Sequence, residues 1–174
     1  MNKINIVNYR PQHQPWFELF NRNWIEKYFE MEAVDVFVLT NPEEAILKNG
    51  GAIFMAEYDG QIAGTVALKK NNGSTYELTK MAVDENFRRR GIAEELCFAC
   101  FKKAAGSGAS QIVLYSQTRL KPAIALYEKL GFKPVAIEPG KYKRADTKMV
   151  IDIKDAMTSI NNLSTNTQTQ KICV

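Results

Sequence analysis

A basic turn that contains a glycine separates an apolar run from a helix-forming run near the middle of the chain. The apolar run occupies residues 78–83, the turn reads Arg-Arg-Arg-Gly-Ile-Ala at 88–93, and the helix-forming run follows at 94–104. Backbone N–H groups at a helix start have no partner within the helix, and the helix dipole adds positive charge there. Gly91 has no Cβ, so the backbone can come close to a ligand. This order predicts a strand, a phosphate-binding turn and a helix, and a solvated basic helix start is the alternative.

Turn residues divide the rest of the chain into short strands and helices. Alternating or β-branched runs predict strands at 3–7, 52–58, 62–69, 74–83, 111–116, 132–137 and 145–153. Helical spacing and end signals predict helices at 14–29, 91–104 and 122–130, and a fourth that begins at Asn41-Pro42 and ends at Asn49-Gly50-Gly51. Residues 33–39 fit either a short helix or a turn. Hairpins joined to strand–helix–strand crossovers predict an α/β fold of the α+β type, with a mixed, mostly antiparallel sheet of about seven strands and helices on both faces.

The chain length suits one domain with its own core, since it has 174 residues. From Thr158 onward Ser, Thr, Asn and Gln dominate. We therefore expect one domain over residues 1–157, followed by a polar and poorly ordered C-terminal segment over 158–174.

Charge and hydropathy disfavour several classes of partner. The net charge is only +4, and basic residues are interleaved with acidic ones, so the composition does not favour a nucleic-acid binder. Residues 1–10 lack the apolar segment of a secretory signal, and no apolar run approaches the roughly 18 residues of a membrane span. We expect a cytoplasmic protein that binds neither membrane nor nucleic acid.

Two cysteines form a Cys-x-x-Cys pair at Cys97 and Cys100. A redox pair or a zinc site is one interpretation, but both cysteines lie inside an apolar helical run, and His13 is the only histidine. Inert cysteines buried in a helix are the favoured interpretation, and we expect no metal.

Two segments in the right order resemble one family. Residues 78–84 together with the turn at 88–93 resemble the acetyl-CoA-binding motif of the GNAT superfamily of N-acetyltransferases. Residues 123–132, Ala-Ile-Ala-Leu-Tyr-Glu-Lys-Leu-Gly-Phe, resemble the later helix-to-strand motif of that superfamily. The likeness covers roughly residues 2–153 and implies the acyl-CoA N-acyltransferase fold.

The resemblance implies a site for acetyl-CoA as co-substrate. In this family the fourth strand splays from the fifth, and the pantetheine arm enters the gap. The likeness assigns main-chain contacts with pantetheine to Met81 and Val83, and it places an N–H that polarises the thioester carbonyl near Met81. The residues implied in binding the cofactor are Met81, Ala82, Val83, Arg88, Arg89, Arg90, Gly91, Ile92, Ala93 and Glu94.

The catalytic residues implied by the resemblance are an acid and a base. Glu77 matches a position often used as the base, directly or through water, and a surface acid paired with lysine is its alternative role. Tyr127 matches a tyrosine that protonates the departing thiolate, and core packing is its alternative role. Glu30, Glu32 and Asp35 are weaker candidates for the base. Relatives often carry Asn where this chain has Leu120, which removes one side-chain contact to the cofactor.

The acceptor side is the least defined part of the sequence. The candidates, each with solvated or core packing as its alternative, are Arg22, Trp24, Tyr28 and Arg144, and either arginine suits a substrate carboxylate. The function implied by the resemblance is acetylation of a primary amine of a small molecule. A catalytically silent acyl-CoA-binding regulatory module and a protein N-terminal or lysine acetyltransferase are the alternatives, and a homodimer is left open.

Overall fold

Strands from along the whole chain join one sheet in a computed structural model, which describes residues 3–140 and 142–169, with side chains through residue 163. The sheet has seven strands in the order β1-β2-β3-β4-β5-β7-β6. Only the β4–β5 pair is parallel. The strands are β1 Ile4–Asn8, β2 Ala52–Tyr58, β3 Gln61–Lys70, β4 Thr75–Val83, β5 Gln111–Ser116, β6 Lys133–Val135 and β7 Thr147–Asp152. The predicted fold class is confirmed.

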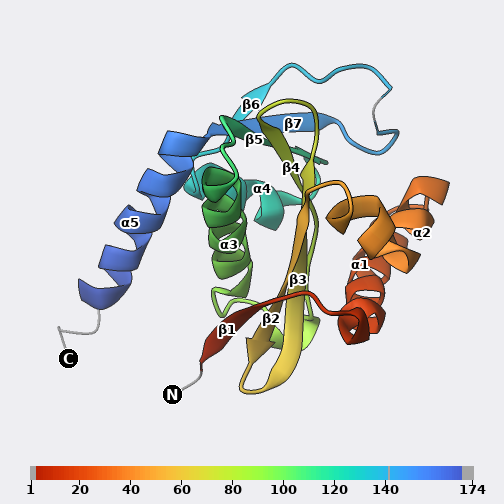
Figure 1. Ribbon diagram of the computed structural model, residues 1–174, viewed down its shortest axis with the longest axis horizontal. Helices are drawn as coiled ribbons and strands as arrows, with labels where there is room; N and C mark the ends of the chain where they lie inside the picture. Colours follow the sequence, from red (N-terminus) through yellow and green to blue (C-terminus); the bar gives the residue numbers. More distant parts are fainter. Residues whose placement is uncertain (1–2, 141, 170–174) are drawn as a thin grey trace.

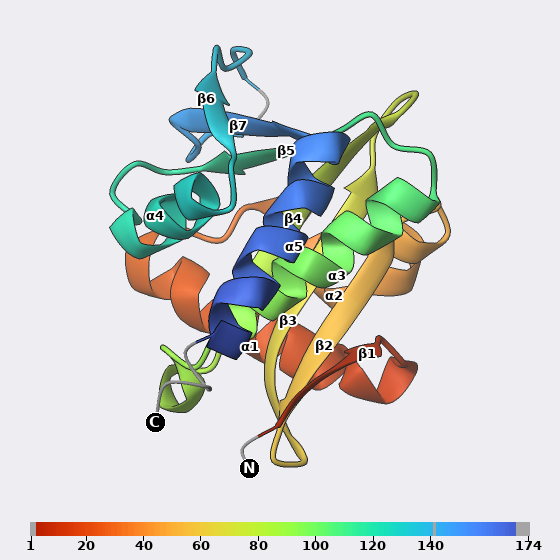
Figure 2. The same cartoon turned by 90° about the vertical axis from the view of Figure 1, so that its left-hand side faces the viewer.

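Helices cover both faces of this sheet (Figure 1). The helices are α1 Gln14–Tyr28, α2 Ala33–Thr40, α3 Ile92–Gly106, α4 Lys121–Lys129 and α5 Ile153–Thr169, with short turns at Pro11–His13, Glu43–Leu47 and Glu85–Phe87. α1 and α2 lie on one side, and α3 and α5 lie on the other (Figure 1). Figure 2 shows α5 crossing over α3. No helix in the described part of the chain has both the length and the apolar character needed to span a bilayer.

Two apolar cores follow from the alternation of side chains along the strands. On the α3 side, Tyr76 and Leu78 of β4 pack with residues of α3, α4 and α5. On the α1 side, Ile53 and Met55 of β2 pack against α1 and α2. Glu77 lies between Tyr76 and Leu78 in the sequence, so its side chain emerges on the α1 side of the sheet.

The sheet opens between its two parallel strands. β4 pairs with β5 only over Thr75–Glu77, opposite Gln111–Val113. Within the described residues, the remainder of β5 pairs with β7 alone. β4 also carries an irregularity opposite Val66, where the register with β3 shifts and Lys80 adopts a left-handed φ of 51°. Among the described residues, the part of β4 beyond Glu77 therefore has no strand partner on the β5 side.

The loop between α1 and β2 differs from the sequence expectation. Residues 33–40 form α2, which settles an ambiguous segment. Asn41 does not cap a following helix as predicted. It ends α2, where its side chain donates to the Phe37 carbonyl over 3.3 Å. Pro42 then leads into a single π-helical turn at Glu43–Leu47.

The C-terminal part of the chain also differs from expectation. Residues 158–169 were expected to be poorly ordered, yet they continue α5, and residues 170–174 lie outside the described part. The physical reason is a narrow apolar stripe at helical spacing, Ile153, Ala156, Met157, Ile160 and Leu163, that packs against the core on the α3 side. The polar residues around this stripe dominate the composition of the segment, so composition alone does not indicate a packed helix.

The last two strands are shorter than predicted. β6 spans three residues instead of the expected 132–137, and it contains Pro134, which cannot donate to a ladder. β7 begins at Thr147 instead of Ala145. The preceding Asp146 uses its carboxylate to accept hydrogen bonds from the backbone N–H and hydroxyl of Thr118, at 2.8 and 2.7 Å.

Candidate functional site

The turn before α3 presents unpaired backbone donors. Arg89 and Gly91 adopt left-handed φ values of 59° and 83°, and Gly91 is the N-cap of α3. Among the described residues, the N–H groups of residues 89–94 donate to no backbone or side-chain acceptor. The first N–H of the helix that forms a hydrogen bond is that of Glu95, which donates to the Gly91 carbonyl. A run of free N–H groups at a helix start is a site for a phosphate group.

The three arginines of this turn play different structural roles. Arg90 folds back onto the protein, where its guanidinium lies 4.9 Å from the centre of the Tyr58 ring and donates to the Tyr58 hydroxyl over 3.2 Å. Arg88 is exposed and pairs with Glu85 at 3.5 Å. Arg89 is exposed, and no ion pair engages it within the described residues. The charge available at the turn therefore comes from Arg88 and Arg89.

The open edge of β4 lies directly before this turn. Ala82 and Val83 pair with Thr65 and Gly64 of β3, so their other edge faces the gap left by β5. Met81 is half-buried, and its sulfur lies 3.6 Å from the thiol of Cys97. Unpaired strand edges accept extended ligands as an added strand.

Tyr127 is buried in α4 on the same side of the sheet as α3. Its ring packs edge-on against Phe132, with the ring centres 5.8 Å apart. Burial, and to a lesser extent the neighbouring thiols of Cys97 and Cys100, raise the pKa of Tyr127 above its ordinary value of about 10. No hydrogen bond between described side chains involves its hydroxyl. The tyrosine is therefore protonated at neutral pH.

The two helix cysteines are buried free thiols, as the favoured interpretation predicted. Burial raises the pKa of both Cys97 and Cys100. Thiols that stay protonated are poor nucleophiles and poor metal ligands.

Glu77 is a buried carboxylate on the other face of β4, with only 1% of its surface exposed. Its Oε1 accepts a hydrogen bond from the Tyr142 hydroxyl over 2.6 Å, and its Oε2 accepts one from the Asn71 amide over 3.4 Å. The alternative role as a surface acid does not fit this burial. A buried carboxylate with hydrogen-bond donors can hold a proton in transit.

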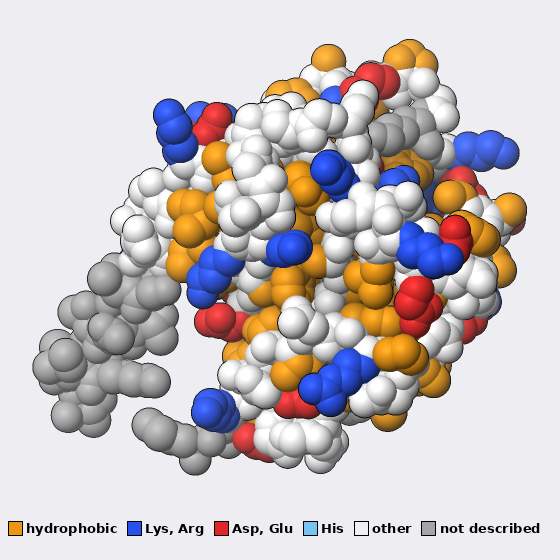
Figure 3. All heavy atoms as spheres, in the orientation of Figure 1, with side chains coloured by type: hydrophobic (Ala, Val, Ile, Leu, Met, Phe, Trp, Pro, Cys, Tyr) orange, Lys and Arg blue, Asp and Glu red, His pale blue; other side chains and the backbone are white. Residues whose placement is uncertain are grey.

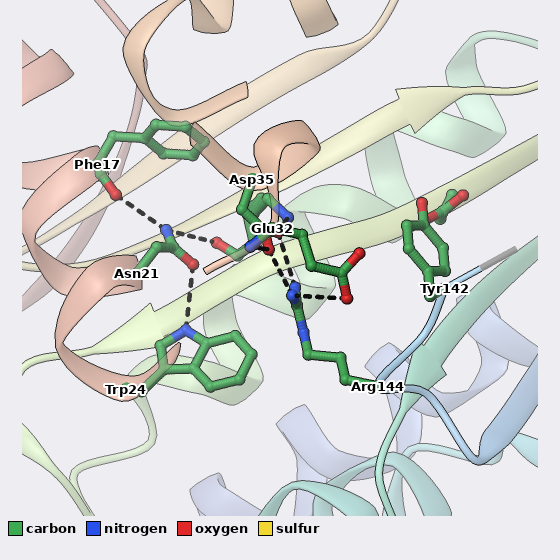
Figure 4. A network of polar contacts seen from close by, with 9 residues as sticks. Phe17, Asn21, Trp24, Glu32, Asp35, Tyr142 and Arg144 are labelled. Atoms are coloured by element: carbon green, nitrogen blue, oxygen red, sulfur yellow. Dashed lines mark hydrogen bonds and ion pairs between the residues drawn. The ribbon is translucent and has the colours of Figure 1, made fainter. Parts of the chain in front are cut away.

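A second buried carboxylate, Asp35, joins three segments of the chain (Figure 4). The Lys80 ammonium lies 2.8 Å from Asp35 Oδ1, and the Arg144 guanidinium binds both carboxylate oxygens. Glu32 adds a contact of 3.7 Å with Arg144. Burial alone would raise the pKa of Asp35, but the hydrogen bonds from Arg144 and the charge of Lys80 outweigh it and hold the pKa below its ordinary range.

Asn21 connects α1 to the irregular part of β4. Its side chain is fully buried and donates to the carbonyls of Phe17 and Lys80, at 2.9 and 3.3 Å. The indole of Trp24 donates to its Oδ1 over 3.2 Å (Figure 4). The hydrogen bond from Asn21 to the Lys80 carbonyl fixes the main chain of β4 one residue before Met81.

A cleft of about 660 Å³ lies where the α1–α2 loop meets the β6–β7 loop. Its lining includes Glu30 and Glu32 on one side and Lys143 and Arg144 on the other. Of the predicted acceptor residues, Arg144 lines this cleft, but its guanidinium is already engaged with Asp35. This cleft is the candidate acceptor site.

The other acceptor candidates lie beside the cleft or away from it. Trp24 and Tyr28 contact Phe29, which lines the cleft, with ring centres 6.2 and 6.5 Å apart. Arg22 pairs with Glu18 and Glu26 on the surface of α1, at 2.7 and 3.5 Å. Arg22 therefore forms its ion pairs within α1 and does not line the cleft.

Comparison with known proteins identifies the family. The family model for the acetyltransferase (GNAT) family matches residues 13–132. The chain belongs to the GNAT family. N-acetylaspartate synthetase from Xenopus tropicalis is 35% identical over 101 residues, which is 57% of this chain but only 37% of that enzyme.

Solved GNAT structures share the fold at lower identity. An acetyltransferase of the GNAT family from Staphylococcus aureus Mu50 has a TM-score of 0.79 and 20% identity, covering 87% of this chain and 99% of that one. An aminoglycoside 6′-N-acetyltransferase complexed with coenzyme A has a TM-score of 0.67 and 18% identity, covering 86% and 97%. The predicted acyl-CoA N-acyltransferase fold is confirmed, and coenzyme A is bound by a protein of this fold.

Proposed function

We propose that this protein transfers the acetyl group of acetyl-CoA to a primary amine of a small molecule by direct attack within a ternary complex. The observation that carries the proposal is the run of free N–H groups at residues 89–94, adjoining the open edge of β4. The two features together fit an anionic ligand with an extended arm. Membership of the GNAT family supports the same assignment.

The donor side of the site is built mainly from backbone. Under this proposal the N–H groups of residues 89–94 hold the pyrophosphate of coenzyme A, and Arg88 and Arg89 add charge. The main chain of Met81, Ala82 and Val83 holds the extended arm along the open edge of β4. Acetyl-CoA supplies a thioester whose carbonyl carbon accepts the attacking amine. Glu94 is expected to act through its N–H, because its carboxylate pairs with Lys129.

Glu77 and Tyr127 lie on opposite faces of β4 and carry out different proton transfers. Glu77 accepts the proton that the acceptor ammonium must lose before it can attack. Tyr127 donates to the departing thiolate, and its raised pKa keeps it protonated for this role. Cys97 contacts Met81 and lies near Tyr127, which supports a position of this tyrosine close to the thioester sulfur.

The acceptor is expected to enter at the cleft between the α1–α2 and β6–β7 loops. Its two sides carry opposite charges, Glu30 and Glu32 against Lys143 and Arg144, which suits an amine that also carries an acidic or polar group. Trp24 and Tyr28 would then support the wall formed by Phe29. One relative, named N-acetylaspartate synthetase, makes L-aspartate a reasonable first acceptor to test.

Figure 3 shows how charged side chains are distributed over one face of the molecule. On the face seen in Figure 3, Lys and Arg side chains stand singly among acidic and apolar ones. Specific binding to nucleic acid needs a basic stripe or patch.

An acetyl-CoA turnover screen tests the proposal. The panel contains L-aspartate, spermidine, kanamycin, free lysine and a short peptide with a free amino terminus, and release of coenzyme A thiol is followed. The wild type should turn over at least one small amine, and Tyr127→Phe should lower kcat by about tenfold to a hundredfold at unchanged coenzyme A affinity. Turnover of the peptide alone would favour a protein acetyltransferase. Coenzyme A binding without turnover of any amine would favour a silent binding module.

A further inference from the structure

The β6–β7 loop places a tyrosine directly on the buried carboxylate of β4. The Tyr142 hydroxyl donates to Glu77 Oε1 over 2.6 Å, the length typical of a hydroxyl that donates to an ionised carboxylate. Tyr142 is separated from Glu77 by 65 positions in the sequence. The edge of the Tyr115 ring supports it, with the ring centres 5.1 Å apart.

Burial separates Glu77 from the acceptor cleft. Only 1% of Glu77 is exposed, so an amine held in the cleft has no open path to this carboxylate. Tyr142 is half-buried, and the next two residues of its loop, Lys143 and Arg144, line the cleft. The Tyr142 hydroxyl contacts Glu77 directly, and the charge of Asp35 also contributes to raising the pKa of Tyr142. Figure 4 shows the tyrosine and Arg144 on the same side of β4.

We propose that Tyr142 relays the proton of the acceptor ammonium to Glu77. This inference rests on the proposed acetyltransferase function and adds a residue to its mechanism. The ammonium gives one proton to the Tyr142 oxygen while the hydroxyl proton of Tyr142 moves to Glu77 Oε1. The products are a neutral amine, a neutral tyrosine and a protonated Glu77, so atoms and charge balance.

The later steps also balance. The amine lone pair forms the new C–N bond, and the C–S bond breaks. Tyr127 gives its proton to the departing thiolate, and the second amine proton then restores the Tyr127 hydroxyl, so coenzyme A leaves as the thiol. Glu77 then returns its proton to solvent through Tyr142. The net reaction releases one proton for each ammonium acetylated.

A phenol suits this position chemically. Its oxygen accepts a proton on a lone pair while its hydroxyl donates one, which neither phenylalanine nor lysine does. Burial first, and the neighbouring Glu77 carboxylate second, raise the pKa of Tyr142 above its ordinary value. The tyrosine therefore passes protons without resting as a phenolate.

The experiment measures single-turnover rates with acetyl-CoA and the best amine of the panel above. Tyr142→Phe should lower the rate by about a hundredfold with a change in KM of less than about threefold. Glu77→Gln should give a similar loss, and the double variant should lose little more, because two groups that act as a unit are not additive. In mixtures of H₂O and D₂O, the wild-type rate should fall along a curve, as expected for two protons in flight.

Tyr115→Phe is the matched control. It removes a hydroxyl that donates to Glu138 over 3.0 Å, and it keeps the ring that supports Tyr142. Its rate should stay within about threefold of the wild type. Coenzyme A affinity and the melting temperature, measured on every variant, check that the fold is intact.

The outcomes separate the relay from the function on which it rests. A Tyr142→Phe rate close to that of the wild type, or a double variant with fully multiplied losses, overturns the relay and leaves the acetyltransferase intact. A loss confined to KM shows that Tyr142 only anchors its loop, which also overturns the relay. Absence of wild-type turnover with every amine removes both the proposed function and the relay.

Discussion

Replacing Asp35 by asparagine should cost much of the stability of this fold. The carboxylate is fully buried, and its two partners are partly buried, with 9% of the Lys80 side chain and 19% of the Arg144 side chain exposed. Removing one member of a buried ion cluster leaves the others desolvated, which typically costs 3–5 kcal/mol. Arg144 keeps its contact with Glu32 at 3.7 Å, so we expect the lower end, about 3 kcal/mol.

Urea unfolding of Asp35→Asn and wild type measures this loss directly. The midpoint should fall at an unchanged m-value, and the melting temperature should fall by about 6–12 °C for a chain of this length. The matched control is Glu85→Gln, which breaks exposed pairs with Lys27 at 3.3 Å and with Arg88 at 3.5 Å and should cost less than about 1 kcal/mol. The double variant Asp35→Asn with Arg144→Gln should lose less than the sum of the two single losses.

The pH dependence of the same loss gives a second test. The pKa of Asp35 is lower in the folded chain than in the unfolded chain, so its stabilisation is complete above about pH 4 and is lost as the pH falls further. The difference between wild type and Asp35→Asn should therefore be constant near neutral pH and should shrink in acid. A loss below about 1 kcal/mol at pH 7, or a difference that grows in acid, would refute the reasoning.

Two further predictions concern the donor side. Because the pKa of Tyr127 is raised, its protonation should not limit turnover in alkali, so the kcat of the wild type should not fall between about pH 8 and pH 10; a decline in that range that is absent in Tyr127→Phe would contradict this. Arg89→Ala should weaken coenzyme A binding by about tenfold in calorimetry without lowering the melting temperature, because Arg89 is exposed at the turn. Arg90→Ala should lower the melting temperature, because it removes the contact with Tyr58. It should leave coenzyme A affinity unchanged, because the N–H groups of the turn stay in place. Equal effects of the two arginines on binding would show that the turn acts by charge alone.

The sequence predicted those parts of the fold whose signals are local. The strands of the hairpin meander and the helix after Gly91 follow from alternation, turn residues and a single left-handed glycine, so their order and the sheet class could be read directly. α5 carried a local signal too, but its stripe at Ile160 and Leu163 is narrow and set in polar residues. The end of α2 at Asn41 could not be read, because the same residue type caps helices at either end.

For the candidate site, the sequence gives local signals on the proposed donor side and few on the proposed acceptor side. Glu77 and Tyr127 were named through family resemblance, and the structure shows both to be buried. The partners of Asp35 and Glu77 were not predictable, since Arg144 and Tyr142 come from a loop 109 and 65 positions away. Arg144 was expected to bind substrate, and the geometry instead engages it with Asp35.

This difference has a physical origin in what each half of the site is made of. In the proposed function, the donor binds to backbone groups of a turn and an open strand edge, and backbone geometry is set by a few residues close in sequence, such as Gly91. The proposed acceptor site is instead built from side chains of separate segments, which the Asp35 cluster joins through Lys80 and Arg144. Because that cluster fixes the β6–β7 loop and Lys80 together, a change in the loop alters the cleft while the backbone of the donor site stays in place. Acceptor preference should therefore respond to substitutions at Lys143 and around it far more strongly than coenzyme A affinity does.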